Sequence, residues 1–303
     1  MKLARVLLAD GSVVVAIAGD DGYRAVADDD PGALLRVLLD RPAPSAGELL
    51  SEASLRVLSP VVDPPSIRDF MIFEEHVINA RAGTGQAVPE AWYDAPVFYF
   101  TNPSCLYGPE QPIPVPPGSR MLDFELEVAC IVGAEVRDLD PEDPASCDAI
   151  AGFMLMNDWS ARDLQMKEMG GGLGPAKGKD FATSLGPWVV TPDELASGAP
   201  GRFACPLEVL VNERRVGGGD LASAYFTWSQ VMGRASANTR VRMGDIIGSG
   251  TVGTGCLLEL RTMGPKEEFP WLRAGDRVDL RGGPLGVLGN PIVDALLSSP
   301  LSI

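Results

Sequence analysis

The sequence predicts an α+β fold in which strands outnumber helices. Short apolar runs of strand length recur along the chain, and turns that contain glycine or proline separate them. Only a few segments show the 3.6-residue periodicity of a helix, and these do not alternate regularly with the strands. The chain therefore lacks the pattern of repeated βαβ units.

The chain of 303 residues is long enough for one large domain with a small companion. We expect residues 1–60 to form a small β-rich N-terminal domain and residues 61–303 to form the larger one. The segment 61–65, which contains two adjacent prolines, indicates the link between them.

Strands are predicted from β-branched and aromatic residues in two-residue alternation, and helices from apolar residues three or four apart. The predicted strands lie within 3–28 and at 97–102, 123–132, 150–157, 187–191, 206–212, 244–249, 256–262, 276–281 and 285–288. The predicted helices lie at 31–40, 45–52, 66–82, 160–169 and 228–238. Five prolines at 109–118 predict an irregular connection, and the glycines at 217–219 predict a turn.

Composition and charge exclude several classes of protein. The formal net charge of −16 argues against nucleic acid or an anionic membrane as a partner, because both require a basic surface. The five cysteines are scattered and show no CxxC spacing, which favours reduced thiols in a cytoplasmic protein. No run of 18 or more apolar residues exists, so the sequence predicts no membrane span.

The chain contains a single histidine, His76. It therefore cannot build a metal site from several imidazoles or an HExxH protease. A serine triad is also disfavoured because no GxSxG motif is present. His76 follows Asp69 by seven residues on a helical pattern, which predicts that both side chains lie on one helix face.

Four acidic residues are candidate metal ligands. Read as a strand, LDFELEVACIVG at 122–133 places Glu125 and Glu127 on one face, and Asp69 and Asp158 lie in two further acidic segments. Carboxylate oxygens favour Mg²⁺ or Mn²⁺, with Ca²⁺ as a third candidate. As alternatives, Glu125 and Glu127 line the wet face of an edge strand, and Asp158 is the N-cap of the helix at 160–169.

Positively charged and amide donors occur near these acids in the sequence. Arg162 and Gln165 share a helix face if 160–169 is helical, and both suit an enolate, a carboxylate or an oxyanion. Lys179 follows a glycine-rich loop and brings a cation near the acids. A phosphate-binding loop is the competing interpretation, but GxxxxGK[ST] is absent.

Taken together, these segments resemble the fumarylacetoacetate hydrolase family from about residue 60 to residue 288. The segments that carry the resemblance are RDFMIFEEH (68–76), VFYF (97–100), LDFELEVACIVG (122–133), LMNDWSARDLQ (155–165), KGKDFATSLGPWVV (177–190) and GSGTVGTGCLLEL (248–260). The resemblance implies a catalytic domain of the family's mixed β-sandwich or roll type, preceded by a small β-rich domain. It also implies a homodimer.

The resemblance further implies roles for individual residues. Asp69, Glu125, Glu127 and Asp158 would bind a divalent cation, with Lys179 and Thr183 at the edge of the site. His76 would be the general base, oriented by Glu259. Arg162, Gln165 and Lys179 would stabilise developing charge, and Tyr99 and Thr251, together with Arg162 and Gln165, would contact substrate.

The implied activity is hydrolysis of a carbon–carbon bond in a β-diketo acid of the acylpyruvate or fumarylacetoacetate type. His76 would activate water, and the cation would stabilise the enolate that leaves. One alternative is a decarboxylase, hydratase or isomerase of a 2-oxo acid on the same scaffold. The other is a non-catalytic protein in which Ca²⁺ ties strands together.

Overall fold

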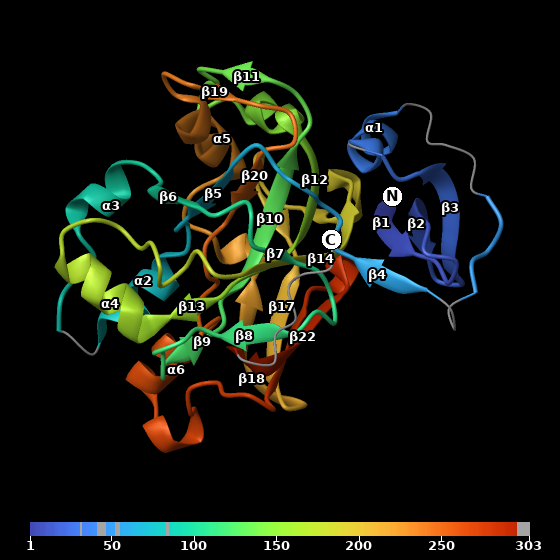
Figure 1. Ribbon diagram of the computed structural model, residues 1–303. Coiled ribbons are helices and arrows are strands. Elements are labelled where there is room, and N and C mark those ends of the chain that lie inside the picture. Colours follow the sequence, from blue (N-terminus) through green and yellow to red (C-terminus); the bar gives the residue numbers. More distant parts are fainter. Residues whose placement is uncertain (31, 41–46, 52–54, 83–84, 296–303) are drawn as a thin grey trace.

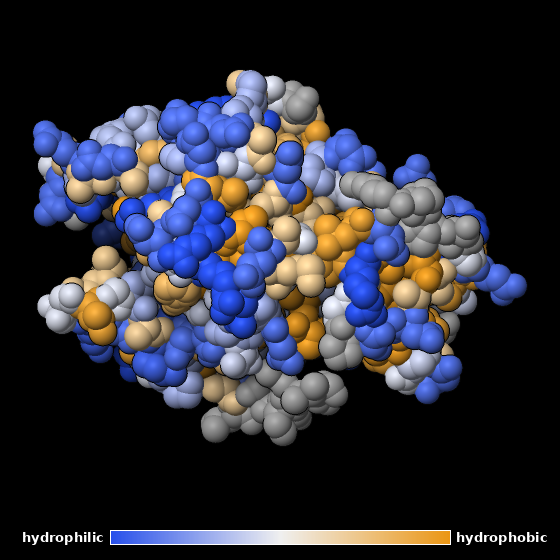
Figure 2. Space-filling model, turned by 90° about the horizontal axis from the view of Figure 1, so that it is seen from above, coloured by the Kyte–Doolittle hydropathy of each residue, from blue (hydrophilic) through white to orange (hydrophobic). Residues whose placement is uncertain are grey.

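The protein is described by a computed structural model that covers residues 1–30, 32–40, 47–51, 55–82 and 85–295. Strands dominate the chain, as Figure 1 shows, and the predicted β-rich α+β class is confirmed. No helix among the described residues is both long and apolar enough to cross a lipid bilayer. In the view of Figure 2, hydrophilic residues cover much of the surface, and hydrophobic residues are visible in separate areas toward the middle and the right.

A large mixed sheet of eleven strands forms the centre of the described chain, in the order β3-β2-β1-β14-β12-β10-β20-β5-β6. This order contains nine of the eleven strands. The other two lie beside it, because β4 pairs with β1 and β7 pairs with β14. The strands are β1 (Lys2–Leu7), β2 (Val13–Gly19), β3 (Gly22–Asp28), β4 (Arg56–Leu58), β5 (Ile67–Phe70), β6 (Phe98–Thr101), β7 (Leu106–Tyr107), β10 (Leu126–Val132), β12 (Ile150–Asp158), β14 (Thr183–Val190) and β20 (Ile246–Gly248).

A second sheet of five strands has the order β18-β17-β21-β22-β8. Its strands are β8 (Ile113–Val115), β17 (Pro206–Val211), β18 (Arg214–Asp220), β21 (Arg277–Arg281) and β22 (Val287–Asp294). Short two-stranded pairs join β9 (Leu122–Asp123) to β13 (Ser160–Ala161), β11 (Val136–Arg137) to β19 (Arg240–Val241), and β15 (Ala196–Ser197) to β16 (Phe203–Ala204).

Six α-helices are present among the described residues. They are α1 (Ala33–Leu39), α2 (Glu74–Ala82), α3 (Glu90–Asp94), α4 (Arg162–Gly170), α5 (Trp228–Ser236) and α6 (Leu257–Met263). Short 3₁₀ helices lie at Pro144–Ala149, Pro192–Glu194, Leu221–Ser223, Lys266–Glu268 and Gly283–Leu285.

Strand β10 is buried on both faces, which explains its apolar run from Val128 to Val132. Val128 and Cys130 face a core shared with the second sheet, where Leu207 and Leu280 lie. Ala129, between them, faces a separate core that also contains residues of α1. The centre of the large sheet is therefore packed between a second sheet and a helix. This packing holds the strands that carry the side chains at one end of the sheet.

The N-terminal strands continue the large sheet, since β1 pairs with β14 at Leu3↔Val189. In Figure 1 this part of the chain lies to one side of the main body. The division at residue 60 stays a proposal. Of the helix predicted at 45–52, the described residues 47–51 contain no helix, because Leu49 bridges to Arg24 and Leu50 donates to Tyr23; the remainder lies outside the described residues.

The helix predicted at 66–82 is wrong over its first half. Residues Ile67–Phe70 form β5, which pairs with β20 on one side and β6 on the other, and α2 begins only at Glu74. Pairing on both sides satisfies the backbone of this buried segment, which outweighs local helical periodicity. Asp69 and His76 therefore do not share a helix face, and the sheet and the helix position them separately.

The strand predicted at 256–262 is also wrong, because Leu257–Met263 form helix α6. Leucine, glutamate and arginine favour helix, and the short alternating pattern concealed that preference. The turn predicted at 217–219 is strand β18. A Cβ on Gly217 would lie 2.1 Å from the carbonyl oxygen of Thr254, so the glycine there permits a close backbone approach to the loop before α6.

Candidate active site

Four acidic side chains from three parts of the chain meet at one end of the large sheet. Asp69 lies on β5, Glu127 on β10, and Asp158 at the end of β12, while Glu125 occupies the break between β9 and β10. Each offers a carboxylate oxygen, and these oxygens all lie within 4.8 Å of one another. We call these four residues the acid cluster. None is more than 6% exposed, so the interpretation of Glu125 and Glu127 as a wet strand face is wrong.

Gly248, which no motif in the sequence indicated, allows the acid cluster to form. Strand β20 lies between β10 and β5, and Gly248 is the residue of β20 paired with Asp69. A Cβ at Gly248 would lie 2.5 Å from Asp69 Oδ1 and 3.2 Å from Glu127 Oε2. A glycine is therefore required for carboxylates on two strands that are not neighbours to approach each other.

The acid cluster has the chemistry of a hard-cation site. Asp69 Oδ1, Glu127 Oε1 and Asp158 Oδ1 are buried and have no hydrogen-bond partner among the described residues. Burial, together with the other carboxylates, raises the pKa of Asp69 and Glu127 well above the ordinary range. Buried oxygens without partners are costly, and a divalent cation would satisfy them, so these residues fit such an ion.

Lys179 lies against the acid cluster. Its Nζ is 2.6 Å from Glu125 Oε2 and 2.6 Å from Asp158 Oδ2. Burial alone would lower the pKa of Lys179, but Asp158 and Glu125 outweigh it and raise that pKa, so the side chain is a fixed cation. Tyr99 on β6 donates its hydroxyl hydrogen to Asp158, and Thr183 on β14 is the strand partner of Asp158.

Arg162 and Gln165 lie on α4, as predicted, and their side chains meet. Arg162 Nη1 donates to Gln165 Oε1 at 3.1 Å, and Arg162 Nη2 is 2.8 Å from Glu125 Oε1. Burial raises the pKa of Glu125, but Lys179 and Arg162 outweigh burial and lower it to about 2, with a smaller contribution from His76. The residue that precedes α4 is Ala161, so the interpretation of Asp158 as an N-cap is wrong.

The glycine-rich loop before Lys179 is held by a side chain of the protein itself. The Glu168 carboxylate accepts hydrogen bonds from the backbone N–H groups of Ala176, Lys177 and Gly178. These are the donors that a phosphate group would need. The contacts therefore support a loop that is closed on Glu168 and that places Lys179, and they argue against the phosphate interpretation.

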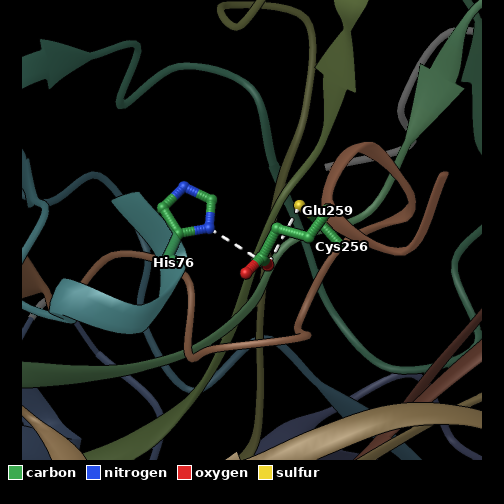
Figure 3. A group of neighbouring side chains, drawn as sticks. All are labelled: His76, Cys256 and Glu259. Atoms are coloured by element: carbon green, nitrogen blue, oxygen red, sulfur yellow. Dashed lines mark hydrogen bonds and ion pairs between the residues drawn. The ribbon is translucent and has the colours of Figure 1, made fainter. Parts of the chain in front are cut away.

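His76 on α2 faces Glu259 on α6, as Figure 3 shows. The distance from His76 Nδ1 to Glu259 Oε2 is 3.1 Å, although Nδ1 makes no aligned hydrogen bond with any described residue. The second ring nitrogen points away from Glu259 in Figure 3. Glu259 Oε1 accepts from Asn79 Nδ2 at 3.1 Å and from Thr254 N at 3.0 Å, which fixes the carboxylate.

Asp123 connects Arg162, which lies next to the acid cluster, with helix α6, which carries Glu259. The sequence motifs did not single it out. Its carboxylate accepts from Arg162 Nε at 2.8 Å, and from the backbone N–H groups of Leu257 at 2.8 Å and Leu258 at 3.0 Å. Cys256, the N-cap residue of α6, makes no side-chain cap, so Asp123 caps this helix from a distant part of the chain. The signal available in the sequence was a third acid beside Glu125 in the same motif.

We expect Asp123→Asn to lower the free energy of unfolding by about 2–4 kcal/mol, because it leaves the buried Arg162 guanidinium and an N–H group of α6 facing an amide N–H donor. Urea unfolding would measure this loss. Asp148→Asn is the matched control, since Asp148 is exposed and its substitution should change stability by less than about 0.5 kcal/mol. Equal stabilities for the two variants would contradict the capping role.

Thr251 lies in the loop between β20 and α6 and is 3% exposed. Within the described residues it makes no hydrogen bond to the acid cluster. Its proposed contact with substrate stays a prediction.

Buried carboxylates beside fixed cations and an imidazole–carboxylate pair are the features of an enzyme site, and comparison with known proteins specifies the class. Residues 66–293 match the domain described as "Fumarylacetoacetate (FAA) hydrolase C-terminal". A Burkholderia cenocepacia protein named "Putative hydrolase" is 31% identical over 260 residues, which cover 80% of this chain and 85% of that protein. The chain therefore belongs to the fumarylacetoacetate hydrolase family of enzymes.

Solved structures share the fold over almost the whole chain. A fumarylacetoacetate hydrolase from Exiguobacterium antarcticum is 23% identical with a TM-score of 0.76, covering 97% of this chain and 99% of its own. A 5-carboxymethyl-2-hydroxymuconate delta-isomerase from Mycobacterium smegmatis is 24% identical with a TM-score of 0.72, covering 97% of this chain and 100% of its own. The predicted family-type fold is confirmed.

Proposed function

We propose that this protein is a metal-dependent hydrolase that cleaves a carbon–carbon bond in a β-diketo acid of the acylpyruvate or fumarylacetoacetate type. The observation that carries the proposal is the set of three buried carboxylate oxygens of the acid cluster, which make no hydrogen bond with any described residue. Membership of a hydrolase family supports the reaction class.

The acid cluster would hold Mg²⁺ or Mn²⁺. When bound, such an ion supplies Lewis-acid stabilisation of the negative charge that develops on substrate oxygens. Each of Asp69, Glu127 and Asp158 offers a free buried oxygen for it. Glu125 already contacts Lys179 and Arg162, so it links the cation site to the positive side chains that would face the substrate.

His76 would take a proton from water, and the resulting hydroxide would add to the carbonyl carbon distal to the carboxylate. Glu259 next to Nδ1 would hold the proton there and leave the other ring nitrogen free to accept one. As the carbon–carbon bond breaks, its electron pair passes to the departing fragment as an enolate, which is then protonated.

Arg162, Gln165 and Lys179 would stabilise the oxyanion formed by addition. The first two are already in contact, and Asp123 holds the guanidinium from behind, so little reorganisation is needed. Lys179 is buried and carries a fixed charge, which strengthens its interaction with an anion. Tyr99 and Thr251 would contact the substrate itself.

We expect turnover to depend entirely on a divalent cation. Acylpyruvates, fumarylpyruvate, fumarylacetoacetate and oxaloacetate would be incubated with Mg²⁺ or Mn²⁺, and products identified by mass. Hydrolysis should yield two acid fragments, EDTA should abolish it, and excess Mg²⁺ should restore it. Release of CO₂ or an unchanged mass would instead identify a decarboxylase or an isomerase on the same scaffold. Activity that survives EDTA would refute the role of the acid cluster.

A further inference from the structure

A second group of potential metal donors lies behind the imidazole. It consists of His76 from α2 with Cys256 and Glu259 at the start of α6, the three side chains drawn in Figure 3. One ligand atom of each lies within 4.8 Å of the other two. Glu259 Oε2 is central, because it lies 3.1 Å from His76 Nδ1 and 3.3 Å from Cys256 Sγ.

The three donor atoms lie in the interior, since Cys256 and Glu259 are fully buried and His76 Nδ1 is a buried atom. The other oxygen of Glu259 is held by Asn79 and Thr254, so the carboxylate cannot easily turn away. His76 is 9% exposed, and its Nδ1 is buried without an aligned hydrogen bond to any described residue. A buried nitrogen that lies 3.1 Å from a carboxylate oxygen without an aligned hydrogen bond is the second sign of a ligand here.

The donor set differs in kind from the acid cluster. One sulfur, one nitrogen and one oxygen form a set typical of Zn²⁺, whereas four carboxylates suit Mg²⁺ or Mn²⁺. Ligand bonds of about 2.0–2.3 Å in a tetrahedral zinc site place neighbouring donor atoms about 3.3–3.6 Å apart. The two separations from Glu259 Oε2, 3.1 and 3.3 Å, are close to that spacing.

The surrounding charge also favours a cation. Glu259 Oε2 lies 3.3 Å from Cys256 Sγ and 3.1 Å from His76 Nδ1, so a carboxylate stands between the other two donors. Its negative charge would attract a divalent ion, which coordinates a cysteine as the thiolate.

We propose that His76 Nδ1, Cys256 Sγ and Glu259 Oε2 bind Zn²⁺, and that this ion inhibits the enzyme. On binding, Cys256 loses its proton to solvent. The imidazole remains neutral, and because its Nδ1 lone pair is occupied, its one proton resides on the other nitrogen. That nitrogen then has no lone pair with which to accept a proton from water. The inhibition rests on the proposed function, whereas the zinc site itself does not.

Cobalt tests the site without reference to activity. The EDTA-dialysed full-length protein, kept in excess Mg²⁺ to fill the acid cluster, would be titrated with Co²⁺. We expect a thiolate-to-cobalt charge-transfer band in the near ultraviolet, which Zn²⁺ then abolishes by displacement. Cys256→Ser should lose the band, while Cys205→Ser, a substitution at another buried cysteine, should keep it. Serine keeps a donor toward Glu259, so the fold should be preserved.

Activity assays separate this proposal from the proposed function. With saturating Mg²⁺, Zn²⁺ should inhibit the wild type, and Cys256→Ser should require at least about tenfold more Zn²⁺, each variant being compared with its own zinc-free rate. No thiolate band in the wild type, or an equal band in Cys256→Ser, would overturn the zinc site even if the enzyme is active. A cysteine-dependent band in a protein that hydrolyses none of the tested diketo acids would refute the proposed function alone.

Discussion

Replacing Glu127 by glutamine should abolish activity and yet leave the cation-free protein at least as stable as the wild type. Glu127 is fully buried, its Oε1 has no hydrogen-bond partner among the described residues, and its Oε2 accepts the N–H of Gly250 at 3.1 Å. Without a cation the charged form of this carboxylate destabilises the folded protein, because burial and the neighbouring acids oppose its charge. Glutamine keeps the shape and removes the charge.

With the cation bound, the wild type should become more stable than Glu127→Gln. A ligand that binds only the folded state at a hundredfold excess over its Kd stabilises the wild type by about 2.7 kcal/mol. Glu127→Gln should lose most of this gain, and its hydrolytic rate should fall by about 100-fold or more, since Lewis-acid stabilisation is worth several kcal/mol. Thermal unfolding with EDTA and with Mg²⁺ or Mn²⁺ measures the stability without and with the cation, and the diketo-acid assay measures the rate.

Asp245→Asn is a control for which we expect the opposite effect on the stability of the cation-free protein. Asp245 is as deeply buried as Glu127, but it is paired, with Arg68 Nη1 at 3.0 Å and the N–H of Arg242 at 2.8 Å. Breaking this pair should destabilise the protein by about 3–5 kcal/mol and leave the rise in melting temperature caused by the cation intact. If Glu127→Gln lowers the stability of the cation-free protein as much as Asp245→Asn does, Glu127 is a structural residue and the metal assignment is wrong.

The elements that sequence could predict are those with a strong local signal. The apolar run at 150–156 predicts the strand at 150–157, which is observed as Ile150–Asp158, and the Arg162–Gln165 spacing predicts the observed helix, because burial and periodicity agree there. The segment at 67–70 was predicted as helix because its pairing partners, β20 and β6, are distant in sequence. Non-local strand pairing leaves little trace in local periodicity.

The candidate active site likewise combines residues with a local sequence signal and residues whose role depends on contacts distant in sequence. Glu125 and Glu127 are carboxylates within an otherwise apolar segment, which makes them recognisable in the sequence. The structure places them with Asp69 and Asp158. The contributions of Gly248 and Asp123 depend on contacts across strands and between a loop and a helix, so no spacing rule reveals them. Only the family resemblance indicates Glu259, because the local pattern of its segment predicts a strand and not the observed helix.

Replacing His76 by alanine should abolish hydrolysis while the cation still binds. Since His76 is the chain's only histidine, no second imidazole can substitute for it. Loss of a general base lowers the rate by about 10²- to 10⁴-fold, and we expect this loss in kcat. The rise in melting temperature with Mg²⁺ should persist, because the acid cluster is unchanged. Decarboxylation of oxaloacetate, if the protein catalyses it, should decline far less, because that reaction needs no attack by water.

Two further variants make this result specific. Ile78→Ala truncates an exposed side chain on the same helix and should retain full activity. Glu259→Gln keeps the carboxylate's shape and its contact with Thr254 but removes the charge beside Nδ1, so its activity should lie between that of the wild type and that of His76→Ala. Hydrolysis by His76→Ala within about threefold of the wild-type rate would exclude His76 as the base, because such a change falls far below the general-base contribution. The water would then have to be activated at the acid cluster, where Lys179 already contacts Glu125 and Asp158 and Tyr99 already donates to Asp158.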